Sequence, residues 1–439
     1  MYTKIIEFLR NKNIAIVGFG KEGKSTYNFL RKHLDQKLTI VDNNCELLVQ
    51  NPELEKDKNL DFVLGDDALN NLDIYDLLIK APGVRFKDID ISSFKDKITS
   101  QLGLILDFFR SNVIGITGTK GKSTTTSLIY SILKDQGKDA YLLGNIGIPI
   151  FDYVEQFTEE SILVIESAAL QLEYVKSSPH ISIILNLFEE HLDFFGSKEA
   201  YFLSKMNIFK YQTESDFGIY TSSNDTLNSY IKSDNYKAKL FDIENIKVEN
   251  DVAFLGDKKL YNINDERLLL GKHNLTNIFF ALVVSEILDL DLYKTVSSIN
   301  NFKPLEHRME FVGTFNGVKY YNDSIATIPD ACINCCDTLK PDTIIFGGMD
   351  RGIDYSQLIS YFNNSDIENF ICMPQTGYKI GEQLTHKNVY FIENLNEAVK
   401  KAKEVTKKVC VMSPAAPSYN AFKNFEEKGK MYKTYIKEG

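Results

Sequence analysis

Apolar runs of four or five residues recur along this chain, and several of them end in a glycine-rich or acidic turn. The first run, residues 13–17, leads into Gly-Phe-Gly-Lys-Glu-Gly at 18–23, a predicted helix at 25–34, and a second run at 38–41 that ends at Asp42. Continuous apolar runs are typical of strands that are buried on both faces of a parallel sheet. The spacing therefore predicts a Rossmann-like strand-helix-strand unit, whose glycines lie where the backbone of such folds approaches a diphosphate.

Further apolar runs continue this alternation of strands and helices. Strands are predicted within 73–84, which runs into Ala-Pro-Gly-Val, and at 113–114, 162–165, 181–185, 343–346 and 409–412. Residues 214–270 are richer in Asp, Asn and Lys, and they predict short exposed strands. A chain of 439 residues is too long for one ordinary core. We therefore expect an α/β protein of three domains: a Rossmann-like domain at 1–105, a central P-loop ATPase domain with a mainly parallel sheet at 106–302, and a Rossmann-like domain at 303–439.

The sequence Gly-Ile-Thr-Gly-Thr-Lys-Gly-Lys-Ser-Thr at 115–124 lies between the short run 113–114 and a predicted helix. In such a turn, glycines let backbone N–H groups converge on a phosphate, and the helix N-terminus adds positive potential. Lys122 supplies a mobile cation, and Ser123 supplies a hydroxyl for Mg²⁺. The strict Walker A spacing would need glycine at Ile116, so an ordinary turn before a helix is the alternative. We interpret the segment as an ATP site, formed by Gly118, Thr119, Lys120, Gly121, Lys122, Ser123 and Thr124.

Composition and charge narrow the class of protein. Lys and Arg number 50 against 60 Asp and Glu, so the formal charge is −10, and nucleic acid is not an expected partner. No apolar run approaches the ~20 residues that span a bilayer, and residues 1–13 lack the apolar core of a signal peptide. We expect a cytoplasmic, monomeric protein with no membrane partner.

Six cysteines in a chain of this length do not indicate a disulfide framework. Cys332, Cys335 and Cys336 cluster, which raises a zinc site as an alternative. No second Cys or His pair lies nearby at finger-like spacing, and the segment predicts a helix. We expect small buried thiols.

Acidic residues and a histidine follow two of the predicted central strands. Strand 162–165 ends at Glu166, and strand 181–185 is followed by Asn-Leu-Phe-Glu-Glu-His-Leu-Asp at 186–193. The carboxyl ends of parallel strands meet at one edge of a sheet, where the Mg²⁺ ligands of a phosphate-binding domain would lie. His191 taken alone would be a capping or surface histidine. Together with the neighbouring strand ends it predicts a metal site.

The order and spacing of these motifs resemble the Mur ligases, ATP-dependent amide-forming enzymes of peptidoglycan synthesis. The matching segments are 117–123, 144–147, Glu166 with Gln171, 186–193, Lys205, 271–277, His307 with Arg308, and 322–324. The N-terminal glycine motif and the segments 324–327, 413–418 and 425–429 are most similar to the glutamate-adding branch. The resemblance implies an acid–amino-acid ligase with UDP-N-acetylmuramoyl-L-alanine and glutamate as substrates, and with ATP and Mg²⁺ as cofactors.

The resemblance also implies roles for residues at matching positions. The UDP-linked substrate would contact Gly20, Lys21, Gly23, Asp42, Asn43, Pro82, Gly83 and Asn145. Two Mg²⁺ ions would be organised by Ser123, Glu166, His191 and Lys205, and the catalytic residues would be Lys122, His191 and Lys205. The ATP site would be completed by Asn274, Asn277, Arg308 and Asp323, and the amino acid would be held by Thr327, Arg351, Ser418 and Phe425. In this family the lysine at the position of Lys205 carries a CO₂-derived carbamate, whereas the sequence alone indicates a surface lysine on an amphipathic helix.

Two departures in the amino-acid pocket leave the acceptor open. Ile325 stands where the family motif Asp-Ser-Lys-Ala-Thr has lysine, and Arg351 stands where lysine is common. The planar fork of arginine binds a carboxylate in a different geometry. D-Glutamate is the favoured acceptor, and an L-glutamate-adding variant is the alternative. Another superfamily ligase, such as folylpolyglutamate synthase, is a further alternative, while an NAD(P)-binding oxidoreductase would explain only residues 18–23.

Overall fold

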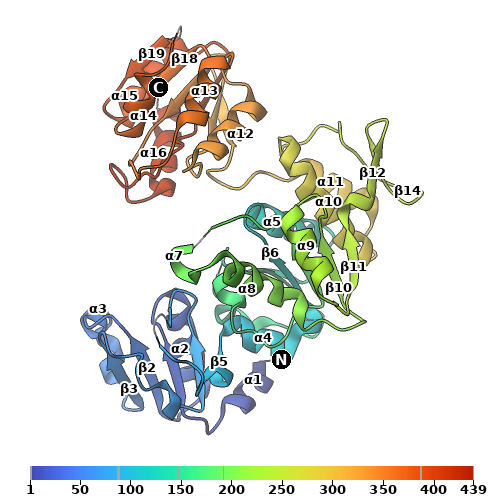
Figure 1. The fold of residues 1–439 in the computed structure, drawn as a ribbon, viewed down its shortest axis with the longest axis vertical. Coiled ribbons are helices and arrows are strands. Elements are labelled where there is room, and N and C mark those ends of the chain that lie inside the picture. Colours follow the sequence, from blue (N-terminus) through green and yellow to red (C-terminus); the bar gives the residue numbers. More distant parts are fainter. Residues whose placement is uncertain (1, 87–88, 147, 191, 386–387, 439) are drawn as a thin grey trace. The chain divides into compact units, whose positions relative to one another are not determined.

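The computed structural model describes residues 2–86, 89–146, 148–190, 192–385 and 388–438 (Figure 1). The chain divides into two compact units, Met1–Asp265 with Leu275–Ile299 and Glu266–Asn274 with Asn300–Gly439. Strands and helices alternate in both units, which confirms the predicted α/β class. The boundaries of the three expected domains stay a prediction.

The first sheet of the first unit has the strand order β3-β2-β1-β4-β5, and its neighbouring strands are parallel. Its strands are β1 (Ile14–Val17), β2 (Leu38–Asp42), β3 (Leu60–Leu64), β4 (Leu77–Lys80) and β5 (Ile98–Thr99). The helices of this segment are α1 (Tyr2–Leu9), α2 (Lys21–His33), α3 (Leu47–Gln50) and α4 (Gln101–Phe109). The strand order reverses between β1 and β4, and open α/β sheets bind ligands beside the carboxyl ends of strands at such a switch point.

The second sheet has the order β11-β10-β9-β6-β8-β7, again with parallel neighbours. Its strands are β6 (Val113–Thr117), β7 (Ala140–Gly144), β8 (Ile162–Glu166), β9 (Ile181–Ile184), β10 (Phe217–Tyr220) and β11 (Lys239–Asp242). The helices of this segment are α5 (Lys122–Asp135), α6 (Ala169–Leu172), α7 (Leu192–Phe195), α8 (Lys198–Lys210) and α9 (Asp225–Ser233). The carboxyl end of β6, between β8 and β9, therefore leads into the predicted phosphate loop.

The expectation of short exposed strands over 214–270 is only partly correct. β10 lies beside β9 in the second sheet, and its Ile219 is completely buried. The helix α9 was not expected in this segment. The remaining strands, β12 (Ile246–Glu249), β13 (Val252–Leu255) and β14 (Lys258–Asn262), form a separate antiparallel sheet. β11 also belongs to the second sheet, beside β10, so the polar composition of the segment hid two strands that extend the central sheet.

The second unit contains a sheet with the order β15-β16-β20-β17-β18-β19, in which β15 is antiparallel to β16 and the other pairs are parallel. Its strands are β15 (Glu310–Phe315), β16 (Val318–Asn322), β17 (Thr343–Phe346), β18 (Asn369–Cys372), β19 (Asn388–Phe391) and β20 (Val409–Met412). Its helices are α12 (Pro329–Leu339), α13 (Ser356–Asn364), α14 (Thr376–Gly381), α15 (Leu395–Val405) and α16 (Phe425–Lys437). Two helices precede this sheet in the chain, α10 (Lys272–Ile287) and α11 (Leu292–Asn301).

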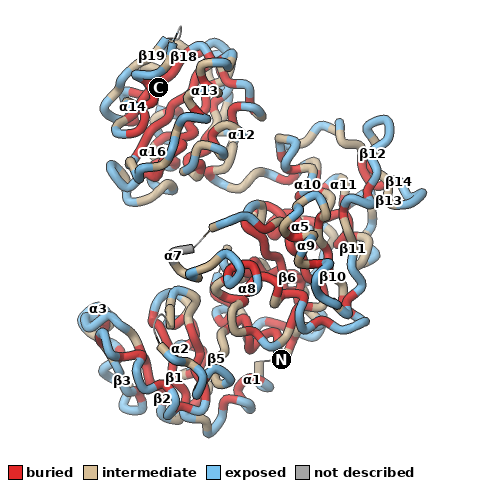
Figure 2. Tube along the Cα trace, viewed as in Figure 1, coloured by how far each residue is buried: buried red, intermediate tan, exposed pale blue. Residues whose placement is uncertain are grey.

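Buried residues are concentrated along the strands of the sheets (Figure 2). In β17, Ile344 and Phe346 belong to one cluster of buried side chains and Ile345 to another, because alternate strand residues point to opposite faces. The cysteines of α12 lie in the first of these clusters and form no disulfide. The prediction of small buried thiols is therefore confirmed. No helix in the described ranges is long and apolar enough to cross a membrane.

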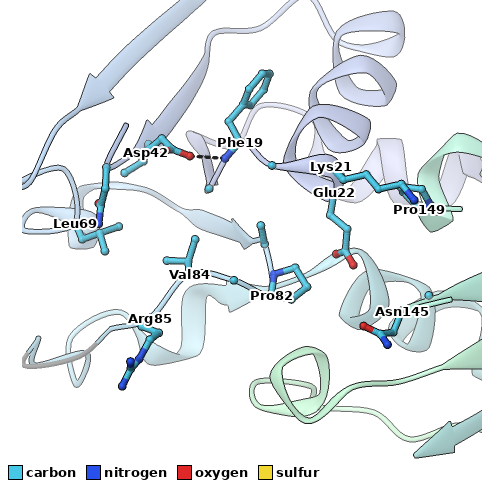
Figure 3. Close-up of a pocket in the computed structure, with 17 residues that line it drawn as sticks. Phe19, Lys21, Glu22, Asp42, Leu69, Pro82, Val84, Arg85, Asn145 and Pro149 are labelled. Atoms are coloured by element: carbon cyan, nitrogen blue, oxygen red, sulfur yellow. Dashed lines mark hydrogen bonds between the residues drawn. The ribbon is translucent and has the colours of Figure 1, made fainter. Parts of the chain in front are cut away.

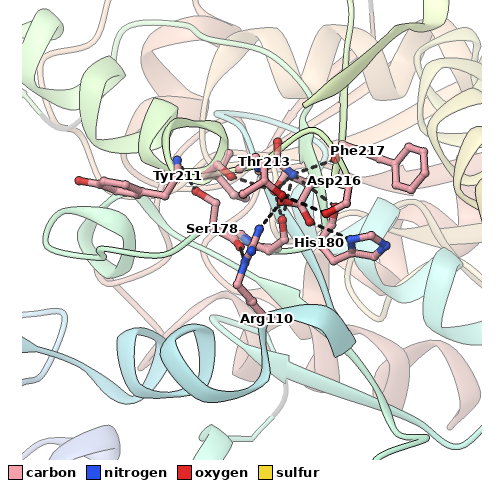
Figure 4. A network of polar contacts seen from close by, with 12 residues as sticks. Arg110, Ser178, His180, Tyr211, Thr213, Asp216 and Phe217 are labelled. Atoms are coloured by element: carbon pink, nitrogen blue, oxygen red, sulfur yellow. Dashed lines mark hydrogen bonds and ion pairs between the residues drawn. The ribbon is translucent and has the colours of Figure 1, made fainter. Parts of the chain in front are cut away.

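A network of polar contacts joins the amino ends of β6, β9 and β10 (Figure 4). The carboxylate of Asp216 pairs with Arg110, lies 2.9 Å from His180 Nδ1, and accepts hydrogen bonds from the N–H and hydroxyl of Thr213 at 2.7 and 2.8 Å. Burial opposes ionisation of Asp216. The hydrogen bonds from His180 and Thr213 and the charge of Arg110 outweigh burial, so the pKa of Asp216 lies below its usual value. Asp216 therefore stabilises the fold in its ionised form.

Replacing Asp216 by alanine should lower the free energy of unfolding by about 3 kcal/mol, because its three partners, Arg110, His180 and Thr213, would lose a buried carboxylate. Since the pKa of Asp216 is depressed, its contribution should be present above the usual carboxyl pKa and fade as the pH falls below about 4. Urea unfolding at several pH values would measure both effects. Substitution of the exposed Asp234 by alanine is the control. Equal stability of the two variants would contradict the stabilising role of Asp216.

Candidate active site

A cavity of about 600 Å³ lies at the switch point of the first sheet, between the turn after β1 and the turn after β4 (Figure 3). Most of the predicted substrate residues line this cavity: Gly20, Lys21, Asp42, Asn43, Pro82, Gly83 and Asn145. Gly23 does not line it. A Cβ atom at Gly23 would lie 1.9 Å from the carbonyl oxygen of Gly18, so this glycine lets α2 pack against the turn. The residues predicted to bind the UDP-linked substrate thus line one cavity, except Gly23, which packs against the turn that forms its wall.

Asp42, at the end of β2, holds the glycine turn in place. One carboxylate oxygen accepts a hydrogen bond from the backbone N–H of Phe19 at 2.6 Å, as Figure 3 shows, and the other accepts from the N–H of Asn44 at 2.8 Å. An acidic residue at this position of a Rossmann-like fold commonly accepts a ribose hydroxyl. Here Asp42 also organises the turn that forms one wall of the cavity.

Sequence reasoning missed several residues of the cavity wall: Gly18, Phe19, Glu22, Val41, Leu69, Ala81, Val84, Arg85, Gly144 and Pro149. Most of them carry no local signal, because their exposure to the cavity depends on how β1, β2 and β4 pair. Arg85 could have been found, since it directly follows the predicted turn after β4. Its guanidinium donates a hydrogen bond to the carbonyl oxygen of Phe194 at 2.9 Å and lies 4.8 Å from that ring's centroid.

The loop between β6 and α5 has the backbone geometry of a phosphate-binding turn. Gly118 and Gly121 have φ angles of 150° and 87°, in the region that favours glycine. Because α5 begins at Lys122, its first N–H groups face the loop. The Lys122 ammonium donates hydrogen bonds to the carbonyl oxygens of Gly118 and Thr119, at 2.9 Å each. Lys122 thus lies over the loop, bonded to two of its carbonyl oxygens.

Two asparagines from distant parts of the sequence hold this loop and the first turn of α5. The amide oxygen of Asn186 accepts hydrogen bonds from the N–H groups of Thr119 and Lys120 at 3.1 and 2.8 Å, and its nitrogen donates to the Lys120 carbonyl at 3.0 Å. The amide oxygen of Asn277 accepts a hydrogen bond from the Thr125 hydroxyl at 3.1 Å. Asn277 was predicted to contact ATP. The clamping role of Asn186 was missed, because it depends on the pairing of β6 with β9.

Glu166 lies at the carboxyl end of β8 and is 1% exposed. Its Oε1 accepts a hydrogen bond from the Asn145 amide at 2.7 Å, whereas its Oε2 is buried with no hydrogen-bond partner among the described residues. The hydroxyl of Thr117, at the end of β6, is likewise buried without a hydrogen-bond partner among the described residues. A buried oxygen without a partner is unfavourable unless a donor or cation reaches it, so this sheet edge fits a Mg²⁺ site.

His191, the predicted imidazole ligand, lies outside the described residues. Within the described part of the chain, no group of three or more His, Cys, Asp or Glu side chains is placed to hold a metal ion. Ser123, in the first turn of α5, and Lys205 are the other predicted contributors to the metal site. The roles of these residues in holding a metal ion stay predictions.

Lys205 lies on α8 and is only 1% exposed, so its interpretation as a surface lysine is wrong. Its ammonium donates a hydrogen bond to the Gly118 carbonyl at 2.7 Å and lies 4.7 Å from the ring centroid of Tyr201. Burial, followed by the charge of Lys122, lowers the pKa of Lys205 to about 7, against the attraction of nearby glutamates. The packing of α8 against the central sheet, rather than the helix sequence itself, puts this amine beside the phosphate loop.

In the second unit, Asp323 directly follows β16. Its oxygens accept hydrogen bonds from the N–H of Met309 at 3.1 Å and from the hydroxyl of Ser413 at 2.8 Å, and burial raises its pKa to about 6. The Nε atom of Arg308 is buried without a partner among the described residues. Asn274, also of this unit, donates its amide to the carbonyl of Leu270 at 2.6 Å. Arg308, the residue before Met309, therefore lies near Asp323, and their contact with a nucleotide stays a prediction.

The predicted amino-acid residues lie after neighbouring strands of the second unit or at the start of a helix. Thr327 follows β16, Arg351 follows β17, Ser418 follows β20, and Phe425 begins α16. Because these three strands are parallel neighbours, their carboxyl ends lie at one edge of the sheet. The Ser418 hydroxyl is buried and has no hydrogen-bond partner in the described ranges, which is a feature expected of a ligand-contacting group.

Hydrogen bonds to its backbone hold the loop that carries Arg351 in place. The N–H of Met349 donates to the Pro417 carbonyl at 2.7 Å, and the buried ammonium of Lys428 donates to the Gly347 carbonyl at 2.8 Å. Arg351 itself is exposed, with its guanidinium 5.9 Å from the Tyr419 ring centroid. Burial lowers the pKa of Lys428 to about 7. The loop therefore presents one exposed cation on a fixed backbone.

Comparison with known proteins agrees with this arrangement. Family models match residues 116–285, as the Mur ligase middle domain, and residues 307–414, as the Mur ligase glutamate ligase domain. A Clostridium kluyveri protein named UDP-N-acetylmuramoylalanine–D-glutamate ligase is 33% identical over 453 residues, which cover 98% of both chains. The chain belongs to the Mur ligase family.

Solved structures support the same fold. The MurF ligase of Thermotoga maritima in complex with ADP has a TM-score of 0.60 at 16% identity, with 97% of this chain and 98% of that chain covered. The UDP-N-acetylmuramate-alanine ligase MurC of the same organism has a TM-score of 0.57 at 18% identity, with 98% and 100% covered. The family models and the relatives named as ligases make this Mur ligase an ATP-dependent amide-bond-forming enzyme, and the oxidoreductase alternative is wrong.

Proposed function

We infer that this Mur ligase joins glutamate, with D-glutamate favoured, to UDP-N-acetylmuramoyl-L-alanine in peptidoglycan precursor synthesis. The observation that carries the proposal is the cavity at the switch point of the first sheet, in a chain 33% identical over nearly its full length to a protein named as the D-glutamate ligase. That relative spans the N-terminal segment as well as the catalytic segments, which favours this branch over the folylpolyglutamate synthase alternative.

The cavity suits a nucleotide diphosphate sugar. The N-terminus of α2, Gly20 and the Lys21 cation would face the diphosphate, because backbone N–H groups and ammonium groups favour anions. Asp42 and Asn43 would lie near the uracil or the ribose, and Pro82 with Gly83 would form the opposite wall. Asn145, which also bonds Glu166, would contact the muramoyl part and so direct the alanine carboxylate toward the phosphate loop.

In the first step, the L-alanine carboxylate would attack the γ-phosphate of ATP, which gives an acyl phosphate and ADP. Lys122 would move from the Gly118 and Thr119 carbonyls to the phosphates and offset the developing charge. Asn274 and Asn277 would contact the adenine, and Arg308 and Asp323 would meet the phosphates and the ribose. Bound Mg²⁺ would supply further charge neutralisation on the phosphate oxygens, held by Ser123, Glu166, His191 and a carbamate on Lys205.

In the second step, the deprotonated amine of glutamate would attack the carbonyl carbon of the acyl phosphate. A tetrahedral intermediate would form, the C–N bond would be completed, and phosphate would leave. Thr327, Ser418 and Phe425 would position the amino acid, and Arg351 would bind a carboxylate through its planar fork. Arg351 replaces the usual lysine and Ile325 removes another, so an L-glutamate-adding variant of the same ligase is the alternative.

Phosphate release with UDP-N-acetylmuramoyl-L-alanine and Mg·ATP, in the presence of either D- or L-glutamate, tests the proposal. We expect turnover with D-glutamate and at most a few per cent of that rate with L-glutamate. Turnover with L-glutamate alone would establish the variant branch and make Ile325 and Arg351 the stereochemical determinants. No turnover with either amino acid would contradict the glutamate-ligase function.

A further inference from the structure

Glu22 places a carboxylate in the wall of a cavity for which a diphosphate ligand is proposed, and the mechanism above gives it no role. It belongs to the first turn of α2, and Figure 3 shows its side chain directed toward the side of the cavity near Pro82 and Asn145. Its Oε1 accepts a hydrogen bond from the side-chain amide of Gln171 at 2.7 Å. Gln171 belongs to α6, the helix that follows Glu166, so this bond links the cavity wall to the edge of the second sheet.

Gln171 is held rigidly for this contact. It is buried, and its amide oxygen accepts a hydrogen bond from the backbone N–H of Ala168 at 3.0 Å. The backbone carbonyl of Glu22 has a second link, from the amide of Gln101 at 3.0 Å, and Gln101 in turn accepts from the N–H of Phe151 at 3.3 Å. The first turn of α2 is therefore attached to the second sheet's segment by both side chain and backbone.

The opposite wall of the cavity is attached to the same place. Lys80 ends β4, directly before the turn that contains Pro82, and it is buried. Its ammonium lies 3.8 Å from a carboxylate oxygen of Glu173 and 5.5 Å from the ring centroid of Tyr174, both of which follow α6. One short segment after Glu166 thus contacts the two elements between which the cavity opens.

The ionised forms of Glu22 and Lys80 stabilise each other. Burial raises the pKa of Glu22, while the Gln171 hydrogen bond and the charges of Lys80 and Lys21 act in the opposite direction. Burial likewise lowers the pKa of Lys80, against the attraction of Glu173 and Glu22. A buried carboxylate is retained at low cost only beside a partner, so Glu22 and Lys80 support each other.

We propose that Glu22 is a positioning residue for the nucleotide sugar. Together with Lys80 it fixes the two walls of the cavity to the α6 segment, Ala169–Leu172 with Glu173 and Tyr174, so that a ligand in the cavity presents its far end to the phosphate loop. The proposal rests on the proposed function of the cavity. It assigns the side-chain oxygen of Glu22 that accepts from Gln171 to the attachment, and not to contact with the diphosphate.

The test compares Glu22→Ala and Glu22→Gln, with Glu55→Ala as an exposed control in the same segment. Binding of UDP-N-acetylmuramoyl-L-alanine and of a non-hydrolysable ATP analogue would be measured by calorimetry, together with KM and kcat. Glu22→Ala should weaken nucleotide-sugar binding about tenfold, since a charged group loses its hydrogen bond, with ATP-analogue binding changed less than about twofold. Glu22→Gln keeps an oxygen acceptor for Gln171 and should restore most of the affinity.

A double-mutant cycle with Gln171→Ala completes the test. In the Gln171→Ala background, Glu22→Ala should have little further effect on nucleotide-sugar binding, because the link is already lost. Additive losses, an equal loss of ATP-analogue affinity, or tighter nucleotide-sugar binding by Glu22→Ala would each overturn the proposal. If the wild-type enzyme itself failed to bind the nucleotide sugar while still binding the ATP analogue, the proposed function would fail and this proposal with it.

Discussion

Replacement of Lys122 by alanine is expected to lower kcat for phosphate release by about 10²- to 10³-fold, the loss typical of removing one preorganised charge-stabilising donor. The Lys122 ammonium lies above the phosphate loop, bonded to the Gly118 and Thr119 carbonyls. Those carbonyls are weak partners compared with a phosphate, so the ammonium can transfer to the nucleotide. Steady-state kinetics of phosphate release would measure the change.

Lys120 provides a matched control two residues away. Its ammonium lies 5.5 Å from the ring centroid of Phe188, and its backbone, rather than its side chain, is held by Asn186. Lys120→Ala should therefore change kcat by less than about tenfold, because only a surface charge near the phosphates is removed. Equal losses for the two variants would indicate a general electrostatic role of the loop, and a Lys122→Ala enzyme within about threefold of wild type would refute the assignment.

Replacement of Lys205 by methionine should reduce turnover by about 10²-fold or more while leaving the fold at least as stable as the wild type. The buried ammonium of Lys205 is unfavourable to the folded state, because burial lowers its pKa to about 7 from an ordinary value of 10.5. Methionine fills a similar volume without that charge. Lower activity with an unchanged or raised melting temperature would separate a catalytic role from a structural one.

The difference in stability between the wild type and Lys205→Met should change with pH in a definite direction. Between about pH 7 and 10.5 the unfolded lysine holds a proton that the folded lysine has lost, so the wild type should gain stability relative to Lys205→Met as the pH rises through this range. Below pH 7 both states are protonated and the disadvantage of the wild type is largest. Parallel stability of the two proteins from pH 6 to 10 would show that the pKa of Lys205 is not depressed.

A depressed pKa also makes Lys205 a suitable acceptor for CO₂. Only the neutral amine adds CO₂, forming a C–N bond and releasing a proton, and about half of the amine is neutral at pH 7 when the pKa is about 7. We expect removal of CO₂ to lower activity and bicarbonate to restore it, in the wild type and not in Lys205→Met. A ¹³C signal from labelled bicarbonate that is absent in Lys205→Met would identify the carbamate directly.

Features encoded over a few consecutive residues could be predicted from the sequence. The strands that contain β1, β2, β6, β8, β9, β17 and β20 follow from continuous apolar runs, because a strand buried on both faces needs apolar side chains at every position. The phosphate loop follows from its glycine and lysine spacing, since φ angles such as those of Gly118 and Gly121 favour glycine.

Part of the candidate site was also accessible, because parallel strands place their carboxyl ends at one edge. Glu166 at the end of β8 was found in this way, whereas Asp323 after β16 came from the family resemblance. Short strands were expected over 214–270, but the pairing of β10 with the central sheet was not recognised, since the segment is polar overall, and α9 was not expected. The residues with assigned roles at the amino-acid pocket came from family resemblance, and their roles stay predictions.

Only the tertiary structure decided which side chains are removed from water and what they meet. Lys205 donates to the carbonyl of Gly118, 87 residues away in the sequence, and Glu22 meets Gln171 across 149 residues. No local pattern distinguishes a buried lysine on α8 from an exposed one, because helical periodicity gives the direction of a side chain and not what packs against it. The sequence therefore determined the strands, the glycine turns and the family, while the packing of α6 and α8 determined the burial, partners and pKa values of the groups on which the chemistry depends.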